Sequence, residues 1–205
     1  MRMFLLFVFA LGIACSSYSQ PYFEGEINYR LETVKKDPSF DAGSLRAAGA
    51  TTSACVFKNG DYIARPSAGS LEYYYFNHTS NRVYSKFKSA DTLFFEPGDE
   101  PMPSQDSVYT IEMQYNTDSI LGYICNRLIL RSKSLKLTIV YSPDLAVDPS
   151  WYKNTKHAYY DVIYSHTRSL FLKSISEFDQ FVSILTAYEV VPRMVKKEEF
   201  PDIKL

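Results

Sequence analysis

The feature that most constrains this chain is a strict alternation of apolar and polar residues in its first long β-prone segment. Residues 23–32 place Phe, Gly, Ile, Tyr and Leu at every second position, with Glu, Asn and Arg between them. Successive side chains of a strand point to opposite faces, so this pattern places one face on a core and the other in water. The segment is therefore predicted to be a half-buried strand.

Turn signals spaced about eight to twelve residues apart divide much of the remaining chain into strand-sized segments. Asn59-Gly60 predicts a two-residue hairpin, because both residues tolerate the positive φ that a type I′ turn requires. The strands expected after residue 50 are 54–57, 62–64, 71–76, 82–87, 92–95, 108–115, 123–130 and 136–141. Such spacing predicts an antiparallel sheet or a partly closed barrel.

Two proline- and glycine-containing segments, 35–50 and 96–107, are expected to be loops. Asp148-Pro149 predicts a single capped helical turn, with Asp148 as the N-cap. Three apolar stretches follow at 158–164, 169–175 and 181–191. The last of these fits neither period cleanly, but its Val, Ile, Thr and Tyr residues favour a strand.

The N-terminus has the pattern of a removable secretory signal. Arg2 precedes an uncharged apolar run from Met3 to Ala14, which is shorter than the roughly 20 residues that span a membrane. Small residues before Gln20 predict cleavage there, giving a signal peptide over 1–19 and one β-rich extracytoplasmic domain over 20–205. Lipidation of Cys15 is the alternative, although Gly12 stands where a lipoprotein signal usually has Leu. No comparable apolar run follows residue 20, so no transmembrane helix is expected in the mature chain.

Charge and composition argue against a nucleic-acid partner. The chain has 23 acidic and 22 basic residues, whereas nucleic-acid binding generally needs a concentrated basic face. It is rich in aromatic residues, with 17 Tyr and 14 Phe, which favour strands. The consecutive aromatics Tyr73 to Phe76 must point to both faces of a strand, and ordinary packing of both faces is favoured over a ligand groove.

Cys55 and Cys125 are the cysteines of the predicted mature chain. An even number in an oxidising compartment makes them a candidate disulfide. The alternative is two separately buried thiols that behave as small apolar residues.

No motif for catalysis or for a metal or other cofactor is recognised. The histidines His78, His157 and His166 lack metal-ligand spacing, and surface or loop positions are expected for them. Nucleotide-binding and serine-hydrolase patterns are also missing from the sequence. No catalytic, cofactor-binding or metal-binding residue is therefore predicted.

Several segments together resemble the GLPGLI family of exported Bacteroidetes proteins. They are Ile120 to Cys125 (ILGYIC), Thr138 to Leu145 (TIVYSPDL), Trp151-Tyr152 and the opening strand Phe23 to Tyr29. The six residues that name the family are missing, and 167–172 is the nearest stretch by position, so a divergent member or a neighbouring family is expected. The resemblance implies a lipoprotein-carrier-like fold, a strongly curved antiparallel sheet or half-open barrel with one or two short helices.

Together, these observations predict an exported protein, periplasmic or associated with the outer membrane. Its expected function is non-catalytic binding of an apolar ligand or lipid, because aromatic strands accompany a carrier-like resemblance. The alternative is a structural or partner-binding envelope protein with no small-molecule ligand. An enzyme is the least favoured of the three, given the missing motifs.

Overall fold

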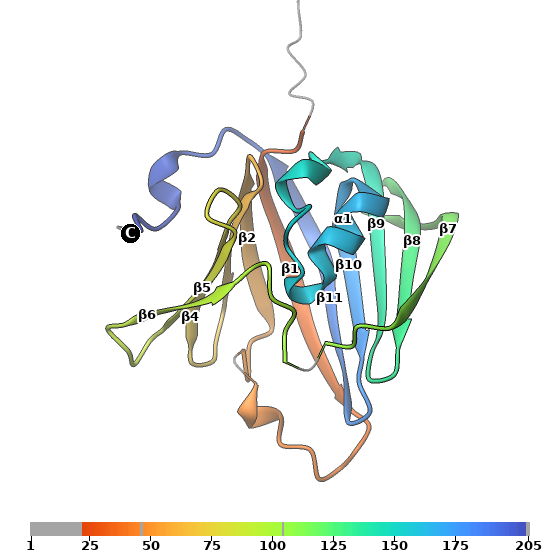
Figure 1. Cartoon of the computed structure of the whole chain (residues 1–205), viewed down its shortest axis with the longest axis horizontal. Coiled ribbons are helices and arrows are strands. Elements are labelled where there is room, and N and C mark those ends of the chain that lie inside the picture. The colour runs from red at the N-terminus through yellow and green to blue at the C-terminus, as the bar shows by residue number, and fades with distance from the viewer. Residues whose placement is uncertain (1–21, 46, 104, 204–205) are drawn as a thin grey trace, which may run out of the picture.

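The computed structural model describes residues 22–45, 47–103 and 105–203, and its strands form one continuous sheet (Figure 1). The predicted signal peptide over 1–19 and Cys15 lie outside the described residues. The strands are β1 (Gly25–Lys35), β2 (Thr52–Lys58), β3 (Asp61–Pro66), β4 (Leu71–Asn77), β5 (Arg82–Phe87), β6 (Leu93–Pro97), β7 (Tyr109–Ile120), β8 (Tyr123–Ser132), β9 (Lys136–Ala146), β10 (Ser169–Glu177) and β11 (Phe181–Pro192).

The sheet consists of two meanders joined at its centre. The strand order is β6-β5-β4-β3-β2-β1-β11-β10-β9-β8-β7, and every neighbouring pair is antiparallel. The first and last strands pair with each other, while β6 and β7, which are consecutive in sequence, form the two outer edges. Figure 1 shows the sheet curving so that these edges face across an open side. The predicted single, strongly curved antiparallel sheet is confirmed.

Local sequence signals explain several of the turns and bends. Asn59 and Gly60 have φ of 49° and 85°, which is the positive-φ pair that the predicted hairpin requires. Register shifts interrupt the ladders of β1 with β11, β4 with β5, β7 with β8 and β9 with β10. Such irregularities bend strands and increase their twist, which helps the sheet to curve.

Strand β9 continues past Pro143, where the sequence led us to expect its end. Its pairing with β8 stops at Tyr141, so the residues that follow need a partner on one side only. A proline lacks the N–H that a central strand uses, but it is tolerated at an edge. Pro143 therefore lies in a part of β9 that has a neighbouring strand on one side only.

The short helices lie within the curve of the sheet (Figure 1). They are η2 (Pro149–Trp151), η3 (His157–Tyr159) and α1 (Tyr160–Thr167), and a further turn, η1 (Ala42–Ser44), lies in the loop after β1. The predicted cap is confirmed, because the Asp148 side chain accepts a hydrogen bond from the backbone N–H of Ser150. We call residues 147–168, which carry η2, η3 and α1, the plug.

Strands β2 to β5 are covered on both faces. Phe57, Tyr62 and Phe76 pack in the concave core with the plug, whereas Val56 and Ile63, which alternate with them, pack on the convex face. The convex cluster is covered by the C-terminal segment (residues 193–203), whose Val195, Phe200 and Ile203 contact it. The last of the short helical turns, η4 (Lys197–Glu199), lies in this segment.

Candidate functional site

The concave side beneath β1 to β4 is filled by aromatic side chains of the protein itself. Tyr152 of the plug stacks on Tyr164 with ring centroids 3.9 Å apart and lies 5.6 Å from the ring of Phe76. Tyr29, Tyr152 and Phe76 are each less than 2 % exposed. The Tyr29 hydroxyl donates a 2.8 Å hydrogen bond to the carbonyl of Phe171. These side chains of the protein itself pack against one another in this half of the concave side.

A buried polar network joins the plug to the sheet. The hydroxyls of Tyr62 and Tyr160 are hydrogen bonded to each other, and the Tyr74 hydroxyl lies 2.9 Å from Nε2 of His157. Nδ1 of His157 lies 3.8 Å from a carboxylate oxygen of Glu96 on β6. Burial raises the pKa of Tyr62 and of Tyr160, so both remain protonated at neutral pH. The network anchors the plug on three different strands.

The histidines occupy three different environments. The expected surface or loop position is wrong for His157, which is 4 % exposed because the plug packs it against β4. His78 lies in the turn after β4, with Nδ1 2.7 Å from Oδ1 of Asp61. His166 is exposed on α1, as expected.

The other half of the concave side contains a cavity. It has a volume of about 260 Å³ and lies between the plug, β9, β10 and the loop that follows β6. Its wall includes Leu137 and Ile139 of β9 and Ile163 of α1. In contrast to the aromatic half, this space is not filled by the side chains around it, and it is our candidate functional site, here called the cavity.

Alternate residues of two strands build one wall of the cavity. Leu137 and Ile139 of β9 face it, as do Ser174 and Ser176 of β10, and the register pairs Ser174 with Ile139. Side chains two positions apart share a face of a strand, which explains the pattern. An otherwise apolar wall therefore carries two hydroxyl groups in succession.

The loop over the cavity is held in place by hydrogen bonds. Gln105 lines the cavity and donates from its side-chain amide to the carbonyl of Lys156, at 2.8 Å. Beside it, Asp106 accepts from the backbone N–H of Ser134 at 2.8 Å and from its hydroxyl at 2.7 Å. The Tyr159 hydroxyl donates to the carbonyl of Asp106 at 2.9 Å. These bonds connect the loop to both the plug and the β8–β9 turn.

A second hollow, of about 760 Å³, lies on the convex side between the β2–β3 hairpin and the C-terminal segment. Among its acidic groups, Asp61 accepts from the backbone N–H of His78 at 2.8 Å and from the Tyr75 hydroxyl at 3.1 Å, and its Oδ1 lies 2.7 Å from Nδ1 of the His78 ring. The carboxylate is thus used to hold the turn after β4, and we do not assign the hollow a ligand.

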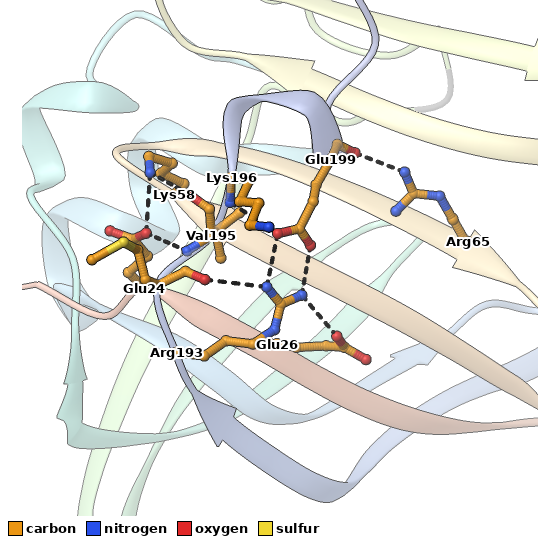
Figure 2. Close-up of polar contacts among 9 residues, drawn as sticks. Glu24, Glu26, Lys58, Arg65, Arg193, Val195, Lys196 and Glu199 are labelled. Atoms are coloured by element: carbon orange, nitrogen blue, oxygen red, sulfur yellow. Dashed lines mark hydrogen bonds and ion pairs between the residues drawn. The ribbon is translucent and has the colours of Figure 1, made fainter.

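The C-terminal segment beside this hollow is held by charged groups, as Figure 2 shows. Arg193 donates to both carboxylate oxygens of Glu199, at 2.9 and 2.7 Å, and to Glu26 at 3.1 Å. Glu24 accepts from the Val195 N–H at 2.6 Å and from the ammonium of Lys58 at 3.1 Å. Hydrogen bonds and ion pairs therefore hold the C-terminal segment on both sides of Val195.

The aromatic run Tyr73 to Phe76 is packed on both faces. Tyr74 and Phe76 lie in the concave core, whereas Tyr75 is 3 % exposed and packs in the convex cluster, with its ring 5.7 Å from that of Phe200. Ordinary packing, which the sequence favoured, is therefore the arrangement found.

The two cysteines are free and buried, and they are not bonded to each other. Cys55 lies on β2 and Cys125 on β8, and four strands separate β2 from β8 in the sheet order. The structure thus has the alternative arrangement of two separate thiols in place of the candidate disulfide. Burial raises the pKa of Cys55 to about 12, which keeps its sulfur in the unreactive thiol form.

Residues 22–45, 47–103 and 105–203 contain no group of three or more His, Cys, Asp or Glu side chains arranged to hold a metal ion. Within the same ranges, no helix has the length and apolarity needed to cross a membrane.

Comparisons with known proteins found remote structural likenesses. No protein-family profile and no curated protein sequence matches the chain. A structure of PNGF-II in a C2 crystal form is similar with a TM-score of 0.48 and 12 % identity, over 86 % of this chain and 29 % of that chain. The Mycobacterium tuberculosis lipoprotein LppX is similar with a TM-score of 0.39 and 10 % identity, over 84 % of this chain and 89 % of that one. The chain thus spans less than a third of PNGF-II.

Proposed function

We propose that this protein is an exported, non-catalytic binding module of the cell envelope that holds a small apolar molecule, or one end of a lipid, in the cavity. The observation that carries the proposal is the contrast between the two halves of the concave side. Aromatic side chains fill the half beneath β1 to β4, whereas about 260 Å³ remains open between α1, β9 and β10. A concave, largely apolar site with a few polar groups is where proteins usually bind small apolar molecules.

The volume limits what the occupant can be. A cavity of about 150 Å³ lined by apolar side chains holds benzene, and sites for drug-sized ligands begin at about 300 Å³. The cavity falls between these values, which favours a single chain or ring. Two acyl chains of a membrane lipid would require the plug to move.

The non-catalytic part of the proposal is supported by the state of the groups that usually carry chemistry. The Cys55 thiol is buried with a strongly raised pKa, and the Asp61 carboxylate is occupied by its neighbours in the turn after β4. The buried His157 is engaged by Tyr74. Each group has a structural role in the fold.

Export and family membership are supported by the sequence. The apolar run before Gln20 has the pattern of a signal peptide, and the ILGYIC and TIVYSPDL segments resemble the GLPGLI family. We propose a divergent member of that family, released into the periplasm or associated with the outer membrane.

Mass spectrometry of the protein isolated from its native host tests the proposal. Wild type should release a small apolar molecule on denaturation, and Ser174→Leu, which places a larger side chain in the cavity, should not. Ser119→Leu, at an exposed position on the edge strand β7, is the matched control and should retain the molecule. Wild type without any bound molecule, or equal amounts with Ser174→Leu, would contradict the proposal.

A second candidate function, binding of a partner protein at a sheet edge, is favoured by strand β6. Its two central phenylalanines, Phe94 and Phe95, are 51 % and 55 % exposed, and an edge strand offers unpaired backbone groups to an added strand. A photo-crosslinking residue at Phe95 should then give one discrete product in the envelope, which Phe94→Lys should abolish. The same product from the exposed position Lys153 would count against this role.

A further inference from the structure

The cavity differs from an ordinary lipid-headgroup site because its wall has no charge. Among the described residues that line it, none is Asp, Glu, Lys, Arg or His. Its ionisable groups are the tyrosines 159, 160 and 164, and burial raises the pKa of each, so they are neutral at physiological pH. A charged ligand would find no counter-ion inside.

Three charged residues near the cavity are engaged elsewhere. Lys136 and Glu177, which neighbour lining positions on β9 and β10, pair with each other at 2.6 Å. Asp106 at the loop takes its hydrogen bonds from Ser134. An ion placed against this wall would therefore lose part of its hydration without a compensating partner, which is unfavourable.

Two hydroxyl groups in the β10 wall are uncommitted. Ser174 and Ser176 line the cavity, and within the described ranges neither hydroxyl hydrogen bonds to another protein group. Ser174 is 8 % exposed. Neither hydroxyl is among the fully buried polar atoms of the described residues that lack a partner, so both are accessible from the cavity, where a group of a ligand can bond to them. By contrast, the Tyr159, Tyr160 and Gln105 polar groups already bond within the protein.

From these observations we infer that the cavity selects an uncharged apolar molecule with one hydroxyl or carbonyl group, which bonds to Ser174 or Ser176. The inference rests on the proposed function and specifies its ligand class. The apolar body lies against Leu137, Ile139 and Ile163, and the hydrogen-bonding group lies at the β10 wall. A fatty acid in its ionised form is excluded, whereas an alcohol, aldehyde or ester of the same length is accepted.

Isothermal titration calorimetry with probes of one chain length tests the inference. The probes are 1-octanol, octanoate and octylammonium at pH 7, with toluene as an apolar ligand that lacks a hydroxyl or carbonyl. We expect 1-octanol to bind and octanoate to bind at least about 100-fold more weakly, because a carboxyl with a pKa near 4.3 must first be protonated. Octanoate affinity should then rise about tenfold for each unit by which the pH is lowered from 7 towards 5.

Variants separate the roles of the hydroxyls and of the cavity. The double variant Ser174→Ala with Ser176→Ala should weaken 1-octanol binding by about 3- to 10-fold, which corresponds to one lost hydrogen bond. Its affinity for toluene should be unchanged, as should the affinity of Ser119→Ala for either ligand. Ser174→Leu should bind none of the probes, and its unfolding midpoint in urea shows that it is folded.

The outcomes distinguish this inference from the proposed function. If octanoate binds as tightly as 1-octanol at pH 7, or if the double serine variant binds 1-octanol like wild type, the ligand class is wrong while the binding function stands. If neither 1-octanol nor toluene binds wild type, both fail. Binding of 1-octanol that survives Ser174→Leu would place the site elsewhere and overturn the inference.

Discussion

Individual buried tyrosines hold the concave core through both their rings and their hydroxyls. Tyr29 is the clearest example, because its side chain is 0 % exposed and its hydroxyl reaches the carbonyl of Phe171. That carbonyl lies where register shifts interrupt the β9–β10 ladder, so a side chain supplies the hydrogen bond there. The tyrosine hydroxyl thus compensates for a local irregularity of the sheet.

Tyr29→Phe is expected to destabilise the fold by about 1–3 kcal/mol, because it leaves a carbonyl without its partner and does not change the packed ring. Urea unfolding monitored by circular dichroism measures this change. Tyr115→Phe is the control, since Tyr115 is 66 % exposed, and its effect should stay within about 0.5 kcal/mol. Equal stability of Tyr29→Phe and wild type would contradict the assigned role of the hydroxyl.

Among the secondary-structure elements, the β2–β3 hairpin is fixed both by its turn and by its contact with the plug. Gly60 has φ of +85°, and a Cβ there would lie 2.7 Å from Cγ of Trp151 on η2. Gly49 provides a comparison, because its φ of +75° is similar and nothing lies within 4 Å of its Cβ position. Substituting each of these two glycines therefore separates the cost of backbone strain from the cost of a steric clash.

Gly49→Ala should destabilise the protein by about 1 kcal/mol, from the positive φ alone. Gly60→Ala should cost more, about 2–4 kcal/mol, since the new methyl group also displaces Trp151. Thermal or urea unfolding of the two variants checks the order. Equal losses of stability in the two variants would mean that a methyl group at position 60 does not clash with the plug.

The C-terminal segment depends on an ion pair whose strength varies with pH. Hydrogen bonds from Arg193 lower the pKa of Glu199 to about 2, from an ordinary value near 4.5. A lowered folded-state pKa stabilises the docked segment above the ordinary value, and this contribution is lost as the pH falls from about 4.5 towards 2. We expect limited proteolysis by pepsin to cut the segment increasingly over that range, and Glu199→Gln to be cut at every pH within it. A wild-type segment equally protected at pH 5 and pH 2.5 would contradict the assignment.

How much of an element could be predicted depended on whether its signal was local. The alternation in β1 and the Asn59-Gly60 turn predicted their structures, because a strand period and a positive-φ pair are properties of neighbouring residues. The continuation of β9 past Pro143 could not be predicted, since it depends on β8 ending its pairing at Tyr141. The serines of the cavity gave no signal either. Ser174 and Ser176 occupy inward positions of β10. Apolar residues at these positions would have indicated the inner face of the strand, but two serines do not.

For the whole molecule, the linear strand order explains why one concave side can be both packed and partly open. Because β6 and β7 stay apart as edges, the plug and the loop after β6 cover the concave side of the sheet. The plug's aromatic residues suffice beneath β1 to β4, whereas α1 has only eight residues and leaves space over β9 and β10. The site is thus a consequence of a short plug in a wide sheet.

The most direct test of the central claim is nuclear magnetic resonance of the protein with labelled isoleucine methyl groups and added 1-octanol. Nuclear Overhauser contacts between the octanol chain and the methyl groups of Ile139 and Ile163, both in the cavity wall, are the result that our account predicts. Ile63 in the convex cluster should show none. Contacts at Ile63 in place of the two cavity isoleucines, or contacts at none of the three under saturating ligand, would contradict it.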